Sequence, residues 1–333
     1  MARVLVTGGA GYIGAHTVLA LMENGYEVVV YDNLSTGQAS AVLPPARLVV
    51  GDVGDTARLG ALMAAETFAA VLHFAGSIVV PESVAHPLAY YHNNTTNTTH
   101  LLSLAVQHGI PHFVFSSSAA VYGMPDTSLI SETMATAPVN PYGRTKLMSE
   151  WMLQDVSAAH PDFSCVILRY FNVAGADPKG RVGQSTPNAT HLIKVAAQAA
   201  LGLRPELQIF GTDYPTPDGT CIRDYIHVTD LAAAHVLALQ HLERGQGSGI
   251  FNCGYGRGYS VREIVRAMHT QCGVHFPVVE TERRPGDPPA LVADPARIKA
   301  VMGWKPKYDD LASITRSAYA WEQELAQRQR CTA

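Results

Sequence analysis

Short apolar runs recur along the first half of the chain, and helix-length stretches separate them. The first two runs are 4–6 and 27–31, and each is followed by polar or glycine-containing sequence. This alternation predicts right-handed βαβ units and therefore a parallel sheet. Further predicted strands lie at 48–50, 71–74, 113–115 and 166–168.

The pattern changes after about Gly175, where proline and glycine become frequent and the predicted strands shorten. We therefore expect a larger domain over residues 1–175 and a smaller mixed α/β lobe over 176–333. A short strand and an alanine-rich helix follow Asp224. We expect residues 224–249 to return to the larger domain.

A glycine-rich segment, Thr7–Gly14, follows the first apolar run directly. Its glycines fit the G-x-G-x-x-G spacing, in which backbone approaches a phosphate closely. We predict a helix over Tyr12–Asn24, with Gly25 as a left-handed stop. The amino end of that helix offers free N–H groups and the positive end of its dipole to a pyrophosphate. The sequence thus predicts a Rossmann-type, doubly wound α/β fold that binds a dinucleotide.

The second predicted strand ends in Asp32, whose carboxylate can accept hydrogen bonds from both ribose hydroxyls. The carboxylate would also repel a 2′-phosphate, and no lysine or arginine occurs in Asn33–Gly37. NAD is therefore favoured over NADP. Gly51–Val53 and His73–Gly76 end the next two strands, at the edge where such sheets hold their ligand.

Tyr142 and Lys146 lie four residues apart on a predicted helix, with Asn140 as its N-cap and Pro141 at its first position. This spacing places both side chains on one helix face. The ammonium and the positive ring of a bound nicotinamide are expected to lower the pKa of the phenol, so that it can act as a base. A serine of the segment 116–118 could help to relay the proton.

Composition narrows the function classes. The chain has 333 residues, of which 47% are hydrophobic and 16% charged, and its net charge is −4. No long basic run is present, so nucleic-acid binding has no electrostatic support. No stretch is apolar enough to span a bilayer, and the first strand begins too early for a signal peptide. Five cysteines without a C-x-x-C pair suggest reduced thiols in the cytoplasm, and the histidines do not suggest a metal site.

The chain resembles the extended short-chain dehydrogenase/reductase superfamily, and within it the enzymes that epimerise UDP-hexoses at C4. The resemblance runs nearly end to end. The segments that carry it are 7–14, 73–76, 116–123, 142–147, 168–172, 211–214, 218–228 and 283–287. The last three belong to the predicted smaller lobe, so they indicate a nucleotide-sugar enzyme rather than the superfamily alone.

The resemblance implies a role for residues at matching positions. Tyr142, Lys146 and Ser118 would be catalytic. The NAD site would contain Gly8, Gly11, Tyr12, Ile13, Gly14, Asp32, Asn33, Leu34, Ser35, Thr36, Gly37, Asp52, Val53, Phe74, Ala75, Gly76, Ser77, Ile78, Asn93, Ser118, Tyr142, Lys146 and Phe171. The UDP-sugar site would contain Ser118, Tyr142, Asn172, His191, Leu192, Gln208, Ile209, Phe210, Arg223, Tyr225, Arg284, Asp287 and Leu291.

Within the implied sugar-nucleotide site, Asn172, Arg223 and Arg284 would hold the diphosphate, since guanidinium groups bind phosphates by charge-assisted hydrogen bonds. Asp287 would bind the uridine ribose, and residues 208–210 would bracket the uracil. The implied reaction interconverts UDP-glucose and UDP-galactose. The sugar is oxidised at C4 to a ketone, rotates, and receives the hydride on its opposite face.

Two other functions are compatible with this scaffold. A nucleotide-sugar 4,6-dehydratase would need an acid and a base beside the sugar, but Ala119 and Ala120 follow the serine where such enzymes carry Asp-Glu. A regulator that binds NAD without chemistry would commonly lose the tyrosine or the lysine. The resemblance also suggests a homodimer formed through helices near 91–108 and 142–159.

Overall fold

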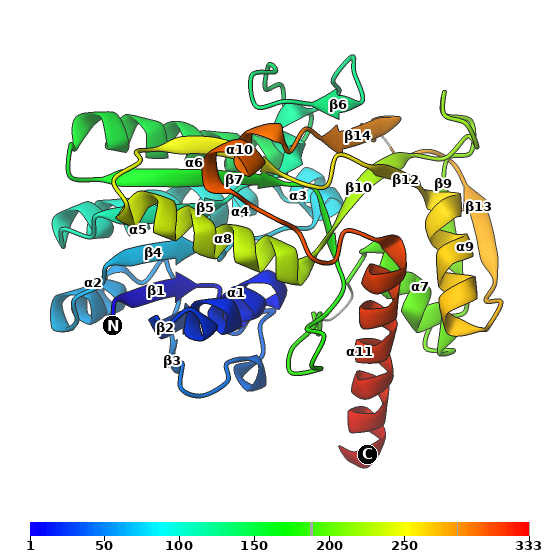
Figure 1. The fold of residues 1–333 in the computed structure, drawn as a ribbon, viewed down its shortest axis with the longest axis horizontal. Coiled ribbons are helices and arrows are strands. Elements are labelled where there is room, and N and C mark those ends of the chain that lie inside the picture. The colour runs from blue at the N-terminus through cyan, green and yellow to red at the C-terminus, as the bar shows by residue number, and fades with distance from the viewer. Residues whose placement is uncertain (187–188, 285, 333) are drawn as a thin grey trace.

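The computed structural model describes residues 1–186, 189–284 and 286–332 (Figure 1). Seven strands in these residues form one parallel sheet, in the spatial order β11-β7-β5-β4-β1-β2-β3. The chain therefore runs outward in both directions from the pair β1 and β4, which confirms the predicted doubly wound fold. The strands are β1 (Arg3–Thr7), β2 (Glu27–Asp32), β3 (Arg47–Val50), β4 (Ala70–His73), β5 (His112–Ser116), β7 (Ser164–Tyr170) and β11 (Gly249–Cys253).

Helices cover both faces of this sheet (Figure 1). Val4 and Val6 pack on one side with α1, α8 and α10, whereas Leu5 packs on the other side with α2, α5 and α6. Since both faces of the inner strands are covered, these strands are continuous apolar runs rather than alternating ones, whereas the edge strand β3 is partly exposed. The helices are α1 (Tyr12–Glu23), α8 (Val228–Glu243), α10 (Ala296–Met302), α2 (Thr56–Ala65), α5 (Asn97–Gln107) and α6 (Pro141–Ala159).

The segment that follows β10 (Ile222–His227) runs back over the large sheet. Helix α8 packs against α1, and β11 then pairs in parallel with β7. The sheet thus extends through Cys253, beyond the stretch 224–249 that we expected to return. The division into domains stays a prediction.

A second group of elements lies beside the carboxyl ends of the large sheet (Figure 1). Strand β10 is central to a mixed sheet with β6, β8, β12 and β14, and β9 pairs with β13. Helices α7, α9 and α11 enclose a separate apolar cluster that includes Ile193, Ile264 and Ile314. These elements are β6 (Leu129–Ile130), β8 (Asn172–Ala174), β9 (Leu207–Phe210), β12 (Gly258–Ser260), β13 (Val278–Thr281), β14 (Ala290–Ala293), α7 (Leu192–Ala200), α9 (Val261–Cys272) and α11 (Leu311–Thr332).

Short helical turns connect several of these elements. The turns are η1 (Ala39–Ala41), α3 (Val80–Ala85), α4 (Pro87–Tyr90), the π-helical η2 (Tyr91–Thr96) and η3 (Ala119–Tyr122).

Among the described helices, none has the length and apolarity needed to cross a bilayer.

A buried ion pair fastens α6 to the sheet. Glu150 of α6 is fully buried, and it accepts a hydrogen bond of 2.9 Å from Nε of Arg169 on β7. Ser117 donates to the same carboxylate, and Arg169 also donates to the hydroxyl of Tyr122 at 3.0 Å. The charges are therefore fully hydrogen-bonded, which is the condition for a pair of this kind to be tolerated in the interior.

We expect Arg169→Met to lower the free energy of unfolding by about 3–5 kcal/mol, because the Glu150 carboxylate stays buried without its counter-charge. Urea titration would measure the loss. Arg262→Met is the matched control, since its partner Glu280 is half exposed and such pairs contribute about 1 kcal/mol or less. Equal losses in the two variants would contradict the assignment of Arg169 and Glu150 as a buried anchor.

Candidate active site

The turn between β1 and α1 is shaped by glycines that allow close backbone approach. Gly8 has a φ of 72°, and a Cβ atom there would lie 2.5 Å from the backbone nitrogen of Ala75. A Cβ atom at Gly14 would lie 2.2 Å from the carbonyl oxygen of Gly8. At Gly11 the same atom would meet only that oxygen, at 3.3 Å. Gly8 and Gly14 thus close the turn, whereas Gly11 leaves its outer side open.

The first turn of α1 is a set of hydrogen-bond donors. Gly11 is the N-cap, and no side chain in the described residues caps this end of the helix. The first turn also contains no acidic residue. The N–H groups of Tyr12 and Ile13 and the positive end of the helix dipole therefore suit a pyrophosphate, so the turn fits the phosphates of NAD.

Asp32 ends β2 and is almost fully buried. Its carboxylate oxygens accept from the backbone nitrogens of Ala10 at 2.9 Å and Leu34 at 2.8 Å. Each oxygen has a second lone pair, so both can still accept from a ribose hydroxyl. The next loop is tied to β3 because Asn33 donates to the carboxylate of Asp52 at 2.7 Å.

The end of β4 is held by a buried asparagine that we did not predict. Asn94 accepts from the backbone nitrogen of Ser77 at 2.7 Å and donates to its carbonyl at 2.9 Å. It also donates to Thr145 on α6 at 3.1 Å. The expected residue, Asn93, donates to the Ser77 hydroxyl at 2.9 Å. The signal for Asn94 was present in the sequence, as an unusual run of asparagine and threonine over 93–99.

The other residues expected around the cofactor differ in their burial and backbone conformation. Val53 and Phe171 are buried, and the ring of Phe74 lies 4.7 Å from that of His235. Ile78 is about half exposed, and Leu34 adopts a φ of 59°. The remaining positions, on the β2 and β4 loops, are Ser35, Thr36, Gly37, Ala75 and Gly76.

Helix α6 presents the proposed base. As predicted, the helix begins at Pro141, and the side chain of Asn140 accepts from the backbone nitrogen of Gly143 at 2.8 Å. Tyr142 and Lys146 are both buried, on the side of α6 that faces the end of β5. The Lys146 ammonium donates to the carbonyl of Ser116 at 2.9 Å and lies 4.9 Å from the Phe115 ring centre.

Burial decides the protonation of these two groups. It raises the pKa of Tyr142, and a hydrogen bond with Ser118 opposes that rise. In the protein by itself the net direction is therefore upward, whereas the lowering that we expected combines the charge of Lys146 with that of a bound nicotinamide. The physical reason is that the loss of water around the phenolate outweighs the other contributions. Burial also lowers the pKa of Lys146 to about 8, and the charge of Glu150 partly opposes this.

Four of the residues expected to bind the sugar nucleotide line one cavity beside β8, α7 and α11. They are Asn172, His191, Leu192 and Tyr225. The same cavity has polar lining residues that sequence reasoning missed, because they come from three separate parts of the chain. These are Gln184, Lys194 and Glu322.

The remaining expected ligands form pairs elsewhere in the smaller group of elements. Arg223 forms an ion pair with Asp287, and the Arg284 guanidinium lies 3.7 Å from the Phe210 ring centre. Leu291 is the β14 partner of Arg223, and it packs in a cluster with Phe171. Two further expected ligands lie apart from these pairs. Gln208 donates to Glu206 at 3.2 Å, and the side chain of Ile209 is buried in the core, so only its backbone is available.

The geometry therefore brings together a dinucleotide turn, a tyrosine with a nearby lysine and serine, and a polar cavity. A sequence model of the NAD dependent epimerase/dehydratase family matches residues 4–254. The chain belongs to this family. The match spans every strand of the large sheet except the first residue of β1, and it ends just after β11.

Similarity to individual known proteins covers nearly the whole chain. The UDP-glucose 4-epimerase of Azospirillum brasilense is 59% identical over 325 residues, which cover 98% of this chain and 93% of that protein. A crystal structure of a UDP-glucose 4-epimerase is 44% identical, with a TM-score of 0.95 over 97% of this chain and 98% of the other. The enzyme from Stenotrophomonas maltophila, with bound NAD and formylated UDP-arabinopyranose, is 40% identical, with a TM-score of 0.95 over 98% of this chain and 100% of the other.

We expect Lys146→Met to raise the free energy of unfolding at pH 7 by about 3 kcal/mol, because it removes a charge that burial disfavours. Below pH 8 the lysine is protonated in both the folded and unfolded states, so the full cost applies. The gain should shrink as the pH rises from about 8 towards the unfolded pKa of 10.5. Urea titrations across this range would measure it.

Lys179→Met is the control, since the side chain of Lys179 is mostly exposed and its substitution should change stability little at any pH. A stability gain in Lys146→Met that does not depend on pH would mean that packing, rather than charge burial, causes the effect.

Proposed function

We propose that this protein is an NAD-dependent UDP-glucose 4-epimerase, which interconverts UDP-galactose and UDP-glucose. The observation that carries the proposal is the position of Tyr142, which is buried beside Ser118 and lies one helical turn from Lys146. All three lie at the end of β5, two strands from the dinucleotide turn of β1. The high identity to UDP-glucose 4-epimerases along the whole chain supports the same conclusion.

The proposed NAD site uses the first turn of α1 for the pyrophosphate and Asp32 for the adenosine ribose. The bound cofactor would accept a hydride from C4 of the sugar and give it back to the opposite face of the 4-keto sugar. Lys146 would keep its position on α6, and its ammonium would donate a hydrogen bond to the ribose beside the nicotinamide. The pair Ser77 and Asn94 would support the cofactor from the end of β4.

Tyr142 would remove the proton from the sugar 4-hydroxyl and return it after the sugar has rotated. Since burial raises the pKa of this phenol in the protein alone, the base must be formed by additional positive charge. Lys146 is the nearby cation that the chain supplies, and Ser118 can stabilise the phenolate by donating a hydrogen bond. The remaining positive charge would come with the nicotinamide.

The proposed substrate site would hold UDP firmly and the sugar loosely. Arg223 and Arg284 would bind the diphosphate, and the ring of Phe210 would pack on the uracil. Asp287 would accept from the uridine ribose, which requires that it share its carboxylate with Arg223. With few direct contacts, the sugar ring would be free to turn.

The alternative of a 4,6-dehydratase has little support in this site. Ala119 and Ala120 begin the turn η3, immediately after Ser118. Neither can donate or accept a proton, so elimination across C5 and C6 would lack its acid and its base. Epimerisation needs neither group.

We predict that Tyr142→Phe keeps the fold and the bound NAD but lowers kcat by about 10²–10⁴, the usual contribution of a general base. The assay is conversion of UDP-galactose to UDP-glucose by purified protein without added NAD. Near-normal turnover in this variant would remove Tyr142 as the base. If the unmodified protein carries NAD but does not convert UDP-galactose, the result would favour a non-catalytic regulator.

We also propose that the enzyme is a cytoplasmic homodimer. The cytoplasmic location is supported by four free thiols in the described residues, Cys165, Cys221, Cys253 and Cys272; the side chain of Cys331 lies outside them. A dimer interface along α5 and α6 is supported by Trp151 of α6, which is 52% exposed although tryptophan is normally buried.

We predict that Trp151→Glu gives a monomer in sedimentation velocity, because a charge in the centre of an apolar interface is costly to desolvate. Leu203→Glu is the control, since Leu203 is equally exposed but lies after α7, far from α6 in the sequence and the fold. If both variants sediment like the unmodified protein, α6 does not form the interface.

A further inference from the structure

His191 differs from the other proposed substrate ligands because its protonated nitrogen is fixed by a neighbour. The side-chain nitrogen of Gln184 lies 2.8 Å from Nδ1 of His191. An amide nitrogen can only donate, so Nδ1 must be the acceptor. The ring proton is therefore on Nε2. In the part of the chain that the structure describes, this Nε2–H has no hydrogen-bond partner, and the ring lines the cavity with Asn172 and Tyr225.

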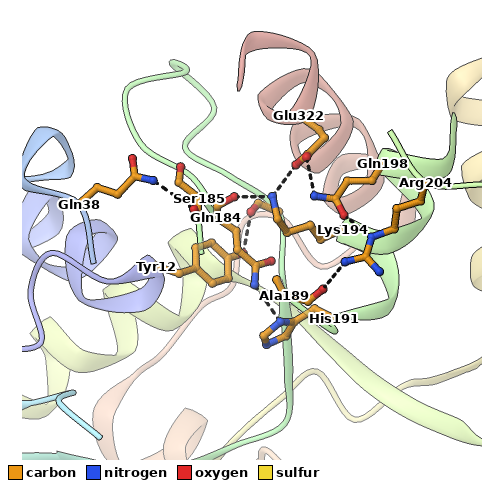
Figure 2. Close-up of polar contacts among 11 residues, drawn as sticks. Tyr12, Gln38, Gln184, Ser185, Ala189, His191, Lys194, Gln198, Arg204 and Glu322 are labelled. Carbon is orange, nitrogen blue, oxygen red and sulfur yellow. Dashed lines mark hydrogen bonds and ion pairs between the residues drawn. The ribbon is translucent and has the colours of Figure 1, made fainter. Parts of the chain in front are cut away.

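Gln184 is held in turn by a buried ion pair. Lys194 of α7 donates to the backbone carbonyl of Gln184 at 2.8 Å and to the carboxylate of Glu322 on α11 at 2.6 Å. Figure 2 shows the Lys194 ammonium between these two acceptors. The side chains of Lys194 and Glu322 are each only 6% exposed, so the charges are paired out of water.

Neighbouring polar contacts keep this arrangement in place (Figure 2). Gln198 donates to the second oxygen of Glu322 at 2.9 Å and accepts from Arg204 at 2.7 Å. On the other side, Gln38, in the loop that follows β2, donates to the backbone carbonyl of Ser185 at 3.2 Å. The segment 184–185, which contains the residue that orients His191, is thus attached through Lys194 to the C-terminal helix and through Ser185 to the loop that follows β2.

We propose that Gln184, held by the Lys194–Glu322 pair, is a positioning residue that fixes His191 as a neutral Nε2–H donor for the UDP diphosphate. The inference rests on the proposed function and adds a mechanism of substrate recognition to it. Burial, and secondarily the charge of Lys194, lower the pKa of His191 to about 4, so the ring is neutral near pH 7. A neutral donor binds a phosphate oxygen without placing a second cation beside Lys194.

The state of the ring can be measured without any enzyme assay. The NMR shifts of the two ring nitrogens of His191 distinguish the tautomers, and a His191→Leu variant identifies the signal. We expect the proton on Nε2 in the unmodified protein. In Gln184→Leu, which removes the fixing donor, we expect a mixture of both tautomers. A proton on Nδ1 in the unmodified protein, or an unchanged tautomer in Gln184→Leu, would overturn the proposal.

A double-mutant cycle with UDP as the probe tests the link to binding. Gln184→Leu should weaken the calorimetric affinity for UDP about tenfold, the effect of losing one hydrogen bond to a charged group. In the His191→Leu background the same change should alter affinity by less than about twofold, since Gln184 then has nothing to orient. Equal losses in both backgrounds would show that Gln184 acts directly or only on folding.

The role of α11 is tested by Glu322→Gln, which keeps hydrogen-bonding capacity but removes the charge. We expect UDP affinity to fall about fivefold, measured where circular dichroism shows the variant to be folded. Glu324→Gln is the matched control on the same helix, because its side chain is nearly half exposed. Unchanged affinity in Glu322→Gln would remove the ion pair from the proposal.

Steady-state kinetics distinguish a failure of this inference from a failure of the proposed function. In Gln184→Leu we expect the KM for UDP-galactose to rise while kcat stays within about twofold, because the chemistry at C4 is untouched. If the protein has the expected tautomer and the double-mutant cycle for UDP binding gives the expected result, but the protein does not epimerise UDP-galactose, only the proposed function is refuted. Normal epimerisation with an unchanged KM in Gln184→Leu would refute the inference alone.

Discussion

The structure depends on keeping a charged lysine out of water beside a phenol. Lys146 is buried, and its ammonium has a backbone carbonyl and an aromatic face around it rather than solvent. Burial lowers the pKa of Lys146 and, by removing water from the phenol, separately raises that of Tyr142, so a charged lysine in this site is costly to fold. The Glu150–Arg169 anchor opposes that cost by holding α6 firmly on β7.

Local signals made most of the fold predictable from the sequence. The runs that became β1 to β5 and β7 were apolar because helices cover both faces of the large sheet, and the cap at Asn140 located the start of α6 to the residue. The pKa direction of Tyr142 could not be predicted, since spacing on a helix does not reveal burial. Asn94 was missed for a related reason, because its partners Ser77 and Thr145 come from distant segments.

The sugar-nucleotide side was harder to predict than the cofactor side. The dinucleotide turn is local, so one segment specifies it, whereas the cavity collects side chains from β8, the segment before α7, and α11. Lys194 and Glu322 lie 128 residues apart, and nothing in either neighbourhood indicates the other. Resemblance supplied His191 as a candidate, but only the folded chain shows which of its nitrogens carries the proton.

Helix α11 contributes Glu322 to a pocket whose other walls are formed much earlier in the chain. During synthesis on the ribosome, every strand of the large sheet emerges before this carboxylate does. Until it arrives, Lys194 has no counter-charge, and the segment bearing Gln184 lacks a fixed support. The nascent protein can therefore complete its dinucleotide half first, and it acquires an ordered sugar-nucleotide pocket only when its last helix docks.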